Sequence, residues 1–351
     1  MGIKHEKVST HNKKAKISGI IVDFEKVRRE KKTEQEGSLF SRIKKGLTLH
    51  VRKILILLIS LLVNNIIVLG VIGLLNRKFH FLETIFVAYG AVEDYALAYF
   101  YPWHMRFMKW NPWPVGFFRQ NNRWGIMFGI TATEKDFYKD DDSIHNNAEL
   151  TYLVEKTEQL RLLLGAEQKT FAGILPGVLF ARKIVTNTPE IDVTLKAVID
   201  AEVKLRMLLG YPDDTPLIIL GGKGFLGRKL MQHLEGRELY CVDADGHNVN
   251  LNSWPKGIEG KKAILINVTR KTVINNYIHL FWPELVLLNE TYPEPSKEEL
   301  KGLNRKGCSA YHVVGVEAVS YPRLPRVYKG GIPCCAAWNS KDLKVILRKL
   351  I

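Results

Sequence analysis

The sequence predicts an α/β protein in which a doubly wound parallel sheet is preceded by a small α/β lobe and by an N-terminal transmembrane helix. Three observations lead to this prediction. Residues 54–75 carry no charge, short apolar runs alternate with segments of helical periodicity from Trp124 onward, and one apolar run leads into a glycine-rich loop at 222–227. Alternation of this kind is typical of parallel sheets, whose strands are covered by helices on both faces.

The charge of the chain is concentrated at its start. The 351 residues carry a formal net charge of +15, and residues 1–53 hold 15 Lys and Arg against 6 Asp and Glu, so this tail contributes +9. The hydrophobic fraction of 46% excludes a disordered chain, and the charged fraction of 25% excludes a wholly membrane-embedded one. Because the basic tail has few aromatic residues and adjoins an apolar run, nucleic acid is not an expected partner.

The uncharged run Ile54–Leu75 is long enough, at about 1.5 Å per residue, to cross a hydrocarbon core of about 30 Å. Asn64 and Asn65 lie in its middle, and we expect the surrounding Leu, Ile and Val residues to outweigh their cost. The alternative is a buried helix of a soluble domain. Lys and Arg before a span mark its cytoplasmic side, so the prediction is a membrane anchor at 54–75 with a cytoplasmic tail at 1–53.

Residues 76–122 are rich in aromatic side chains, including Trp103, Trp110 and Trp113. The first part, 79–100, has the length of a second span but carries three carboxylates, each of which costs about 2.5–3.5 kcal/mol at bilayer depth. We expect an interfacial or second membrane segment that returns the chain to the cytoplasm. The alternative is an aromatic-rich subdomain that packs on itself.

The remainder divides into a small α/β lobe at 123–186, a linking helix at 187–210, a dinucleotide-binding domain at 211–335 and a C-terminal helix at 336–351. Pro189 near its start and Gly210 after its end delimit the linking helix. Further strands are predicted at 124–131, 170–175, 217–220, 238–242, 263–268, 285–288 and 311–316, and further helices at 148–164, 225–234, 272–282 and 295–303.

The glycine loop has the pattern G-x-G-x-x-G at Gly222, Gly224 and Gly227, with a strand before it and a helix after it, which is the context that a dinucleotide-binding motif requires. Gly222 allows the tight turn, Gly224 lets backbone N–H groups approach a pyrophosphate, and Gly227 allows close packing of helix on strand. The helix N-terminus at Phe225 and Leu226 adds about half a positive charge toward the phosphates. The pattern predicts a Rossmann-type sheet; a glycine-rich turn without a ligand is the alternative.

Asp243 lies 21 residues after Gly222, at the end of the second strand of this domain. A carboxylate there binds the adenosine ribose hydroxyls and repels a 2′-phosphate, so NAD is favoured over NADP. Asp245 and His247 lie close by and leave the choice of polar residue open. Asn267 and Thr269, at the end of the third strand, are expected to border the nicotinamide side of the crevice.

Five short motifs carry a resemblance to a known protein family. They are Thr186-Asn187-Thr188, Gly222–Gly227, Tyr292-Pro293, Val327-Tyr328 and Gly330-Gly331-Ile332. From Trp124 on, the chain resembles the amino-acid-dehydrogenase-like group of Rossmann proteins, which includes shikimate dehydrogenases, methylene-tetrahydrofolate dehydrogenases and glutamyl-tRNA reductases. In local detail it looks similar to long-chain acyl-carrier-protein reductases. Those reductases form a thioester on a cysteine beyond the Gly-Gly-Ile element; Cys334 and Cys335 follow it here, but sooner than the pattern places them.

Candidates for the catalytic group are few. Cys334 or Cys335 is a candidate acyl-accepting nucleophile if its pKa is lowered by a nearby cation or helix N-terminus, and simple packing in the core is the alternative. Lys169 is a candidate proton donor or carbonyl polariser, as are Lys183 and Lys223. The four cysteines form no Cys-x-x-Cys pair, so no metal site is expected.

The sequence therefore predicts a membrane-anchored NAD(P)-dependent oxidoreductase acting on a carbonyl or acyl substrate, which is lipid-like if the bilayer presents it. The alternative is a non-catalytic, membrane-tethered dinucleotide-binding sensor or scaffold. The expected partners are membrane lipid and a small-molecule or acyl substrate, and a homo-oligomer remains open. The expected location is the membrane, with the soluble domain in the cytoplasm, because the cysteines do not form a disulfide framework.

Overall fold

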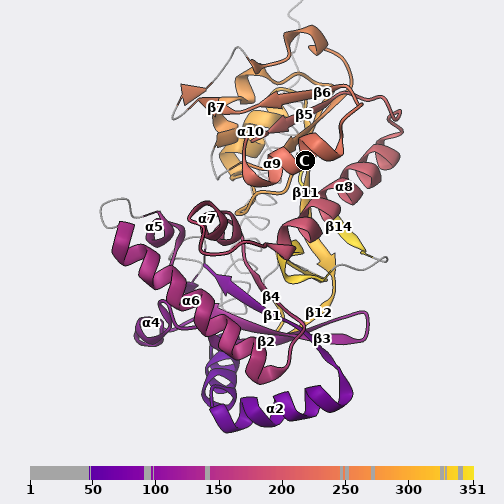
Figure 1. The fold of residues 1–351 in the computed structure, drawn as a ribbon. Helices are drawn as coiled ribbons and strands as arrows, with labels where there is room; N and C mark the ends of the chain where they lie inside the picture. Colours follow the sequence, from indigo (N-terminus) through magenta and orange to yellow (C-terminus); the bar gives the residue numbers. More distant parts are fainter. Residues whose placement is uncertain are drawn as a thin grey trace, which may run out of the picture. The chain divides into compact units, whose positions relative to one another are not determined.

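The computed structural model describes residues 47, 49–90, 96–97, 99–138, 143–245, 248–249, 253–269, 273–324, 328, 330–338 and 343–351. The chain divides into two units, residues 1–54 and 55–351, and the account below concerns the second. This unit is a mixed α/β structure with a five-stranded sheet, a seven-stranded sheet and a two-stranded ribbon (Figure 1).

The helices are the segment Leu49–Val63, α2 (Ile66–Phe79), α4 (Pro102–Met105), α5 (Glu134–Phe137), α6 (Ser143–Leu164), α7 (Leu175–Ala181), α8 (Pro189–Leu209), α9 (Phe225–His233) and α10 (Lys297–Arg305). Short 3-10 helices are η1 (Arg106–Met108), η3 (Lys256–Ile258), η4 (Val273–Asn276), η5 (Ile278–Leu280) and η7 (Cys334–Ala336). The strands are β1 (Leu82–Tyr89), β2 (Trp113–Gln120), β3 (Arg123–Ile130), β4 (Gln168–Phe171), β5 (Leu217–Leu220), β6 (Leu239–Val242), β7 (Ala244–Asp245), β8 (Asn248–Val249), β9 (Ala263–Asn267), β10 (Leu285–Asn289), β11 (Ser309–Glu317), β12 (Val319–Tyr321), β13 (Gly331–Ile332) and β14 (Val345–Lys349).

The prediction of one transmembrane helix over residues 54–75 is wrong. The helix Leu49–Val63 ends inside this run and α2 starts at Ile66. The chain bends by 82° between the two helices. Asn65 is the N-cap of α2, and its side chain accepts a hydrogen bond from the Ile67 N–H at 2.8 Å. A short polar side chain that bonds nearby backbone in this way favours a new helix start over a continuous helix. No single helix of the described residues has the length and apolar character of a span; the bent pair meets both criteria only jointly.

The five-stranded sheet has the order β12-β2-β3-β1-β4, with β1 parallel to β3 and β4, and β2 antiparallel to β3. Strands β1 and β2 come from the segment 76–122, so the expectation of a second membrane segment is wrong there. The alternative of a subdomain that packs on itself is not borne out either, because β1 and β2 pair with β3, β4 and β12 from other parts of the chain. Phe86 and Phe118 are fully buried and meet edge to face, with ring centroids 6.5 Å apart. The aromatic residues thus bury their surface in protein, while Glu83 pairs with Arg123. Residues 93 and 94, two of the three carboxylates, lie outside the described residues.

The larger sheet contains five parallel strands in the order β6-β5-β9-β10-β11, extended by the antiparallel strands β13 and β14 along β11. The chain leaves β5 on one side toward β6 and returns on the other side at β9. The carboxyl ends of β5 and β9 therefore flank a point where the strand order reverses, which is where ligands bind in open α/β sheets.

Two helix predictions in this domain are wrong. The C-terminal helix expected at 336–351 is instead the strand β14, which pairs with β11, and the buried Val345 lies opposite Val316. The backbone pairing that β11 offers overrides the helical pattern. The helix expected at 272–282 is represented by η4 and η5. By contrast, α8 runs from Pro189 to Leu209 as predicted, with Gly210 in the left-handed conformation after it.

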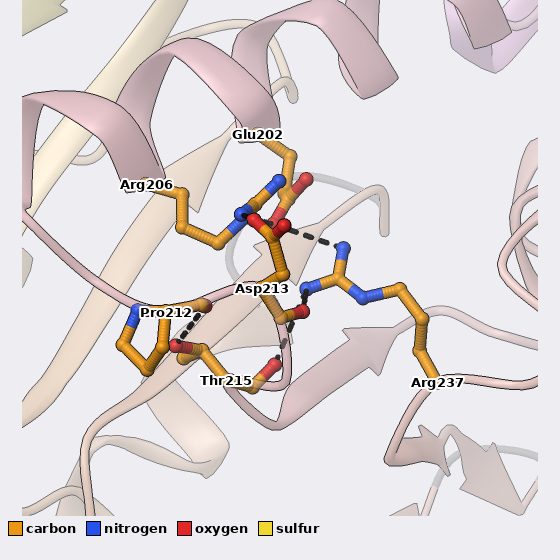
Figure 2. A network of polar contacts seen from close by, with 6 residues as sticks. All are labelled: Glu202, Arg206, Pro212, Asp213, Thr215 and Arg237. Atoms are coloured by element: carbon orange, nitrogen blue, oxygen red, sulfur yellow. Dashed lines mark hydrogen bonds and ion pairs between the residues drawn. The ribbon is translucent and has the colours of Figure 1, made fainter.

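A buried ionic network holds the end of α8 to the loops around β5 (Figure 2). Glu202, only 1% exposed, accepts hydrogen bonds from Arg206 Nε at 3.0 Å and Arg237 Nη1 at 3.1 Å. Arg206 also pairs with Asp213, whose carbonyl oxygen accepts a bond from Arg237 Nη2 at 2.9 Å. Thr215 Oγ1 donates to the Pro212 carbonyl at 2.7 Å. The linking helix is thus bonded to the domain that carries the glycine loop.

Candidate functional site

The glycine loop is a tight turn between β5 and α9, and three of its glycines are closely packed. Gly221 has a φ of 97°, and its N–H donates to the Val242 carbonyl at 2.8 Å. A Cβ on Gly222 would lie 2.4 Å from Cys241 Sγ, and a Cβ on Gly227 would lie 2.0 Å from the Gly221 carbonyl oxygen. The backbone leaves no room for a side chain at Gly227, and a side chain at Gly222 would displace Cys241. Gly222 and Gly227 are two of the three glycines of the motif.

The N-terminus of α9 opens at this loop. Gly224 is its exposed N-cap and makes no side-chain capping hydrogen bond, and the first intrahelical bond is from the Arg228 N–H to the Gly224 carbonyl at 2.9 Å. The N–H groups of Phe225, Leu226 and Gly227 are therefore the first of the helix, without an intrahelical acceptor. Such a helix end favours a negatively charged ligand.

Asp243 lies at the tip of β6, beside the loop, as the sequence predicts. Its Oδ2 accepts a hydrogen bond from the Lys223 N–H at 2.7 Å. The carboxylate is thus fixed against the second residue of the loop. Asp245 lies on β7, and residue 247 is outside the described residues.

Asn267 and Thr269 end β9 on the other side of the switch point. A Cβ on Gly221 would come within 2.9 Å of Thr269 Cγ2, so the two loops touch. The Asn267 amide is used by the protein itself: its Oδ1 accepts from Thr269 Oγ1 at 2.7 Å, and its Nδ2 donates to Asn289 Oδ1 at 2.7 Å. Asn267 therefore shapes this edge of the crevice through Thr269.

A row of polar side chains crosses the sheet at this level. Asn267, Asn289 and His312 are neighbours in register on β9, β10 and β11, and all three are at most 3% exposed. The His312 Nδ1 lies 2.9 Å from the Asn289 carbonyl oxygen. Burial, with Arg348 nearby, lowers the pKa of His312 to about 3, so the ring is neutral. The row therefore places buried, uncharged polar groups on three adjacent strands of the larger sheet.

The small lobe meets the glycine loop through α7. The Phe180 and Phe225 rings lie 5.0 Å apart, and Phe225 also lies 3.8 Å from where a Cβ on Gly177 would be. The Phe225 side chain therefore contacts protein, and its contribution to a cofactor would come from its backbone N–H. The contact brings β4 and the start of α8 close to the carboxyl edge of the larger sheet.

Two cysteines lie at this junction, and both are thiols. Cys335, half-buried on η7, receives a backbone hydrogen bond from Gly173. Burial raises the pKa of Cys335 to about 12, with the Glu290 and Glu190 carboxyls adding to the rise. Burial also raises the pKa of Cys334 well above its usual value. The lowered pKa that a cysteine nucleophile needs is therefore found at neither residue.

Two acids that the sequence reasoning missed share this junction. Glu190, in the first turn of α8, is 2% exposed and its Oε1 accepts from the Phe171 N–H at 3.4 Å; burial raises its pKa to about 7. Glu290 directly follows β10, and burial raises its pKa to about 8. Within the described residues no hydrogen bond or ion pair holds the Glu290 carboxyl. An acid placed directly after the buried strand Leu285–Asn289 was the available signal for Glu290.

Lys169 lies in an ion pair on the small lobe. Its Nζ pairs with Glu158 at 2.8 Å, and Glu158 is also bound by Arg161 at 2.7 Å. These cations, with Arg161 first, lower the pKa of Glu158 to about 2. Lys169 therefore forms an ion pair with α6. Its charge lowers the pKa of Glu190, but less than the other causes change it.

Among the residues that the structure describes, no group of three or more His, Cys, Asp or Glu side chains is arranged to hold a metal ion. An open groove of about 900 Å³ lies along α8 and β14, lined by Val203, Met207 and Leu347 among others, and it shares no residue with the glycine loop or the two acids. The candidate site is thus the carboxyl edge of the larger sheet and the junction with the small lobe. A scan against protein-family models gives no match, and a search of curated proteins gives none either.

Proposed function

We propose that this protein is a dinucleotide-dependent oxidoreductase that reduces a carbonyl or acyl substrate, with NAD preferred over NADP. The observation that carries the proposal is the glycine loop, whose uncapped helix N-terminus opens at the switch point of a parallel sheet. The strand order β6-β5-β9-β10-β11 supports a Rossmann-type domain related to the amino-acid-dehydrogenase-like group. A six-stranded dinucleotide-binding sheet has one more parallel strand beyond the position of β6. In the described residues, β6 is followed instead by the short ribbon of β7 and β8.

The residues present fit a dinucleotide. The packing at Gly222 and Gly227 holds the turn close to β5 and β6, and the exposed Gly224 leaves the backbone accessible to a pyrophosphate. Asp243 lies where ribose hydroxyls would be bound and where a 2′-phosphate would be repelled. Thr269, held by Asn267, borders the position expected for the nicotinamide.

When bound, the nicotinamide supplies a hydride. Addition of a hydride to a carbonyl carbon moves the C=O π pair onto oxygen, which must then take a proton. Glu190 and Glu290 have pKa values of about 7 and 8, so both hold a proton for much of the time at neutral pH. Glu290, the more exposed of the two residues, can donate that proton, become a carboxylate and recover a proton from solvent, whereas Glu190 is only 2% exposed. Cys335, a neutral thiol beside these acids, offers surface for the substrate rather than a nucleophile.

The test is reduction of straight-chain aldehydes by the full chain, followed as loss of NADH absorbance with the alcohol measured in parallel. We expect one alcohol per NADH. Because the donor must be protonated, kcat should fall about tenfold per pH unit above pH 8.

The matched pair is Glu290→Gln, expected to lower kcat at least 100-fold, and Glu317→Gln, at an exposed carboxyl of β11, expected to match the parent enzyme. Binding of NADH without turnover of any carbonyl would contradict the proposal and favour a dinucleotide-binding sensor or scaffold. An unchanged kcat in Glu290→Gln would remove this residue from the mechanism.

A further inference from the structure

One apolar surface remains outside the proposed site. Six side chains on the last turn of the helix Leu49–Val63 and on α2 are each at least 60% exposed, namely Leu61, Leu62, Ile66, Ile67, Leu74 and Phe79. Ile67 and Leu74 are seven residues apart and so lie on one side of α2. We refer to these six residues as the α2 face. Single exposed apolar side chains are common, but a group of this size marks an interaction site.

The opposite side of α2 is fixed on the small lobe. A Cβ on Gly73 would lie 1.9 Å from the Leu163 carbonyl oxygen, so α2 touches the end of α6 backbone to backbone. Asn76 Nδ2 donates to the Gly165 carbonyl at 2.6 Å, and Asn76 Oδ1 accepts from the Leu82 N–H at 2.7 Å. Figure 1 shows α2 lying along the side of this lobe, next to α6. The inner side of α2 is therefore packed against and hydrogen-bonded to the small lobe, and the α2 face points away from the lobe.

The charges around this helix indicate what covers it. The sequence before residue 54 has 15 Lys and Arg against 6 acids, and Lys78 stands in the last turn of α2. Arg77, beside it, is bound to the lobe instead, because its Nη2 donates to the Leu162 carbonyl of α6 at 2.9 Å. The Lys78 Nζ lies 5.4 Å from the centre of the Phe79 ring. An apolar helix face that ends in a cation and an aromatic ring, in a chain whose preceding sequence is basic, is typical of helices that lie in the interface of an anionic bilayer.

We propose that the α2 face docks on the surface of an anionic lipid bilayer, with α2 in the plane of the interface. The inner side of α2 stays on the small lobe, while the α2 face enters the boundary between headgroups and acyl chains. The basic residues beside it meet the anionic headgroups. This proposal does not depend on the dinucleotide site.

The experiment is flotation of the purified full chain with vesicles of phosphatidylcholine alone or with 30% phosphatidylglycerol. We expect the chain to float with the anionic vesicles and to float less with the neutral ones. The variant Leu62→Glu/Ile67→Glu/Leu74→Glu should lower the fraction bound at least tenfold. The uncharged variant Leu62→Gln/Leu74→Gln should show an intermediate loss, and thermal melting checks that both variants fold.

The matched control is Met207→Glu/Leu208→Glu on α8, where the two side chains are 75% and 65% exposed. This variant should float like the parent chain, because α8 lies outside the α2 face. A parent chain that stays with the soluble fraction, or a triple variant that floats as well as the parent, would overturn the proposal. So would a dimer in sedimentation velocity that the triple variant converts to a monomer, because the α2 face would then be covered by a second copy of the chain.

Discussion

Glu190 and Glu290 show what can be read from a residue type and what depends on its surroundings. In the sequence, Glu190 after Pro189 reads as an acid favoured in the first turn of a helix. Its raised pKa comes from burial against β4, a neighbour 19 residues away in the chain. The glycines were predictable from their spacing after an apolar strand, and the requirement at Gly227 is local because a Cβ there would meet the Gly221 carbonyl of the same loop. The neighbour of Gly222, Cys241, is brought there by the fold. The raised pKa values of Cys334 and Cys335 and the ion pair of Lys169 with Glu158 depend on residues that only the folded chain brings together, so the sequence could not show them.

Asp243 carries the cofactor preference, and Asp243→Ala tests it. The change removes the acceptor of the Lys223 N–H and the proposed acceptor of the ribose hydroxyls. NADH binding should weaken by about 1.5–3 kcal/mol, the range for a hydrogen bond to a charged group, while NADPH loses a repulsive neighbour. The ratio of the two dissociation constants should therefore move toward NADPH, as measured by fluorescence titration.

Glu235→Ala, which removes an exposed carboxylate just after α9, is the control and should leave both constants unchanged. If Asp243→Ala weakens NADH and NADPH equally, Asp243 supports the loop alone, and the preference for NAD has another origin.

At the level of elements, the predictions held where the stop and start signals are local. Pro189 and Gly210 delimit α8, and an apolar run followed by the glycine loop gives β5 and α9. The predictions for 54–75 and 76–122 were wrong for a common reason, and the helix predicted at 336–351 was wrong for a different one. Apolar and aromatic composition measures burial, and it does not distinguish lipid, a sheet partner or a helix of the same lobe as the agent that covers the surface. The pairing of β14 with β11 decides the last segment, and only the folded chain brings them together.

The network in Figure 2 links α8 to the glycine-loop domain, and Glu202→Gln tests its contribution. The change leaves Arg206 and Arg237 without their shared carboxylate in a buried position. Loss of one partner of a buried pair costs about 3–5 kcal/mol, and we expect the lower part of that range because both arginines are slightly exposed. The free energy of unfolding from urea titration gives the value.

Asp213→Asn is the matched control, because this carboxylate is 97% exposed and should contribute less than about 1 kcal/mol. Equal losses in the two variants would show that burial of Glu202 does not govern the stability of this junction.

For the whole molecule, the net charge of +15 separates into a strongly basic N-terminal tail and a mildly basic remainder. The two inferences concern different parts of unit 55–351: the α2 face is proposed to meet lipid, and the carboxyl edge of the larger sheet is proposed to bind a dinucleotide. If both hold, the small lobe contacts the bilayer through α2 and the glycine loop through α7. A substrate delivered from the bilayer would then reach the acids at the lobe junction.

Calorimetric titration of the full chain with NADH shows whether the glycine loop binds a dinucleotide. We expect one NADH per chain, weaker binding of NADPH, and loss of binding in Gly224→Val, whose side chain would crowd the exposed loop backbone. Gly257→Val, at an exposed glycine where a Cβ meets nothing within 4 Å, should bind as the parent does. Absence of binding for both NADH and NADPH, with the chain shown to be folded, would contradict the proposed function.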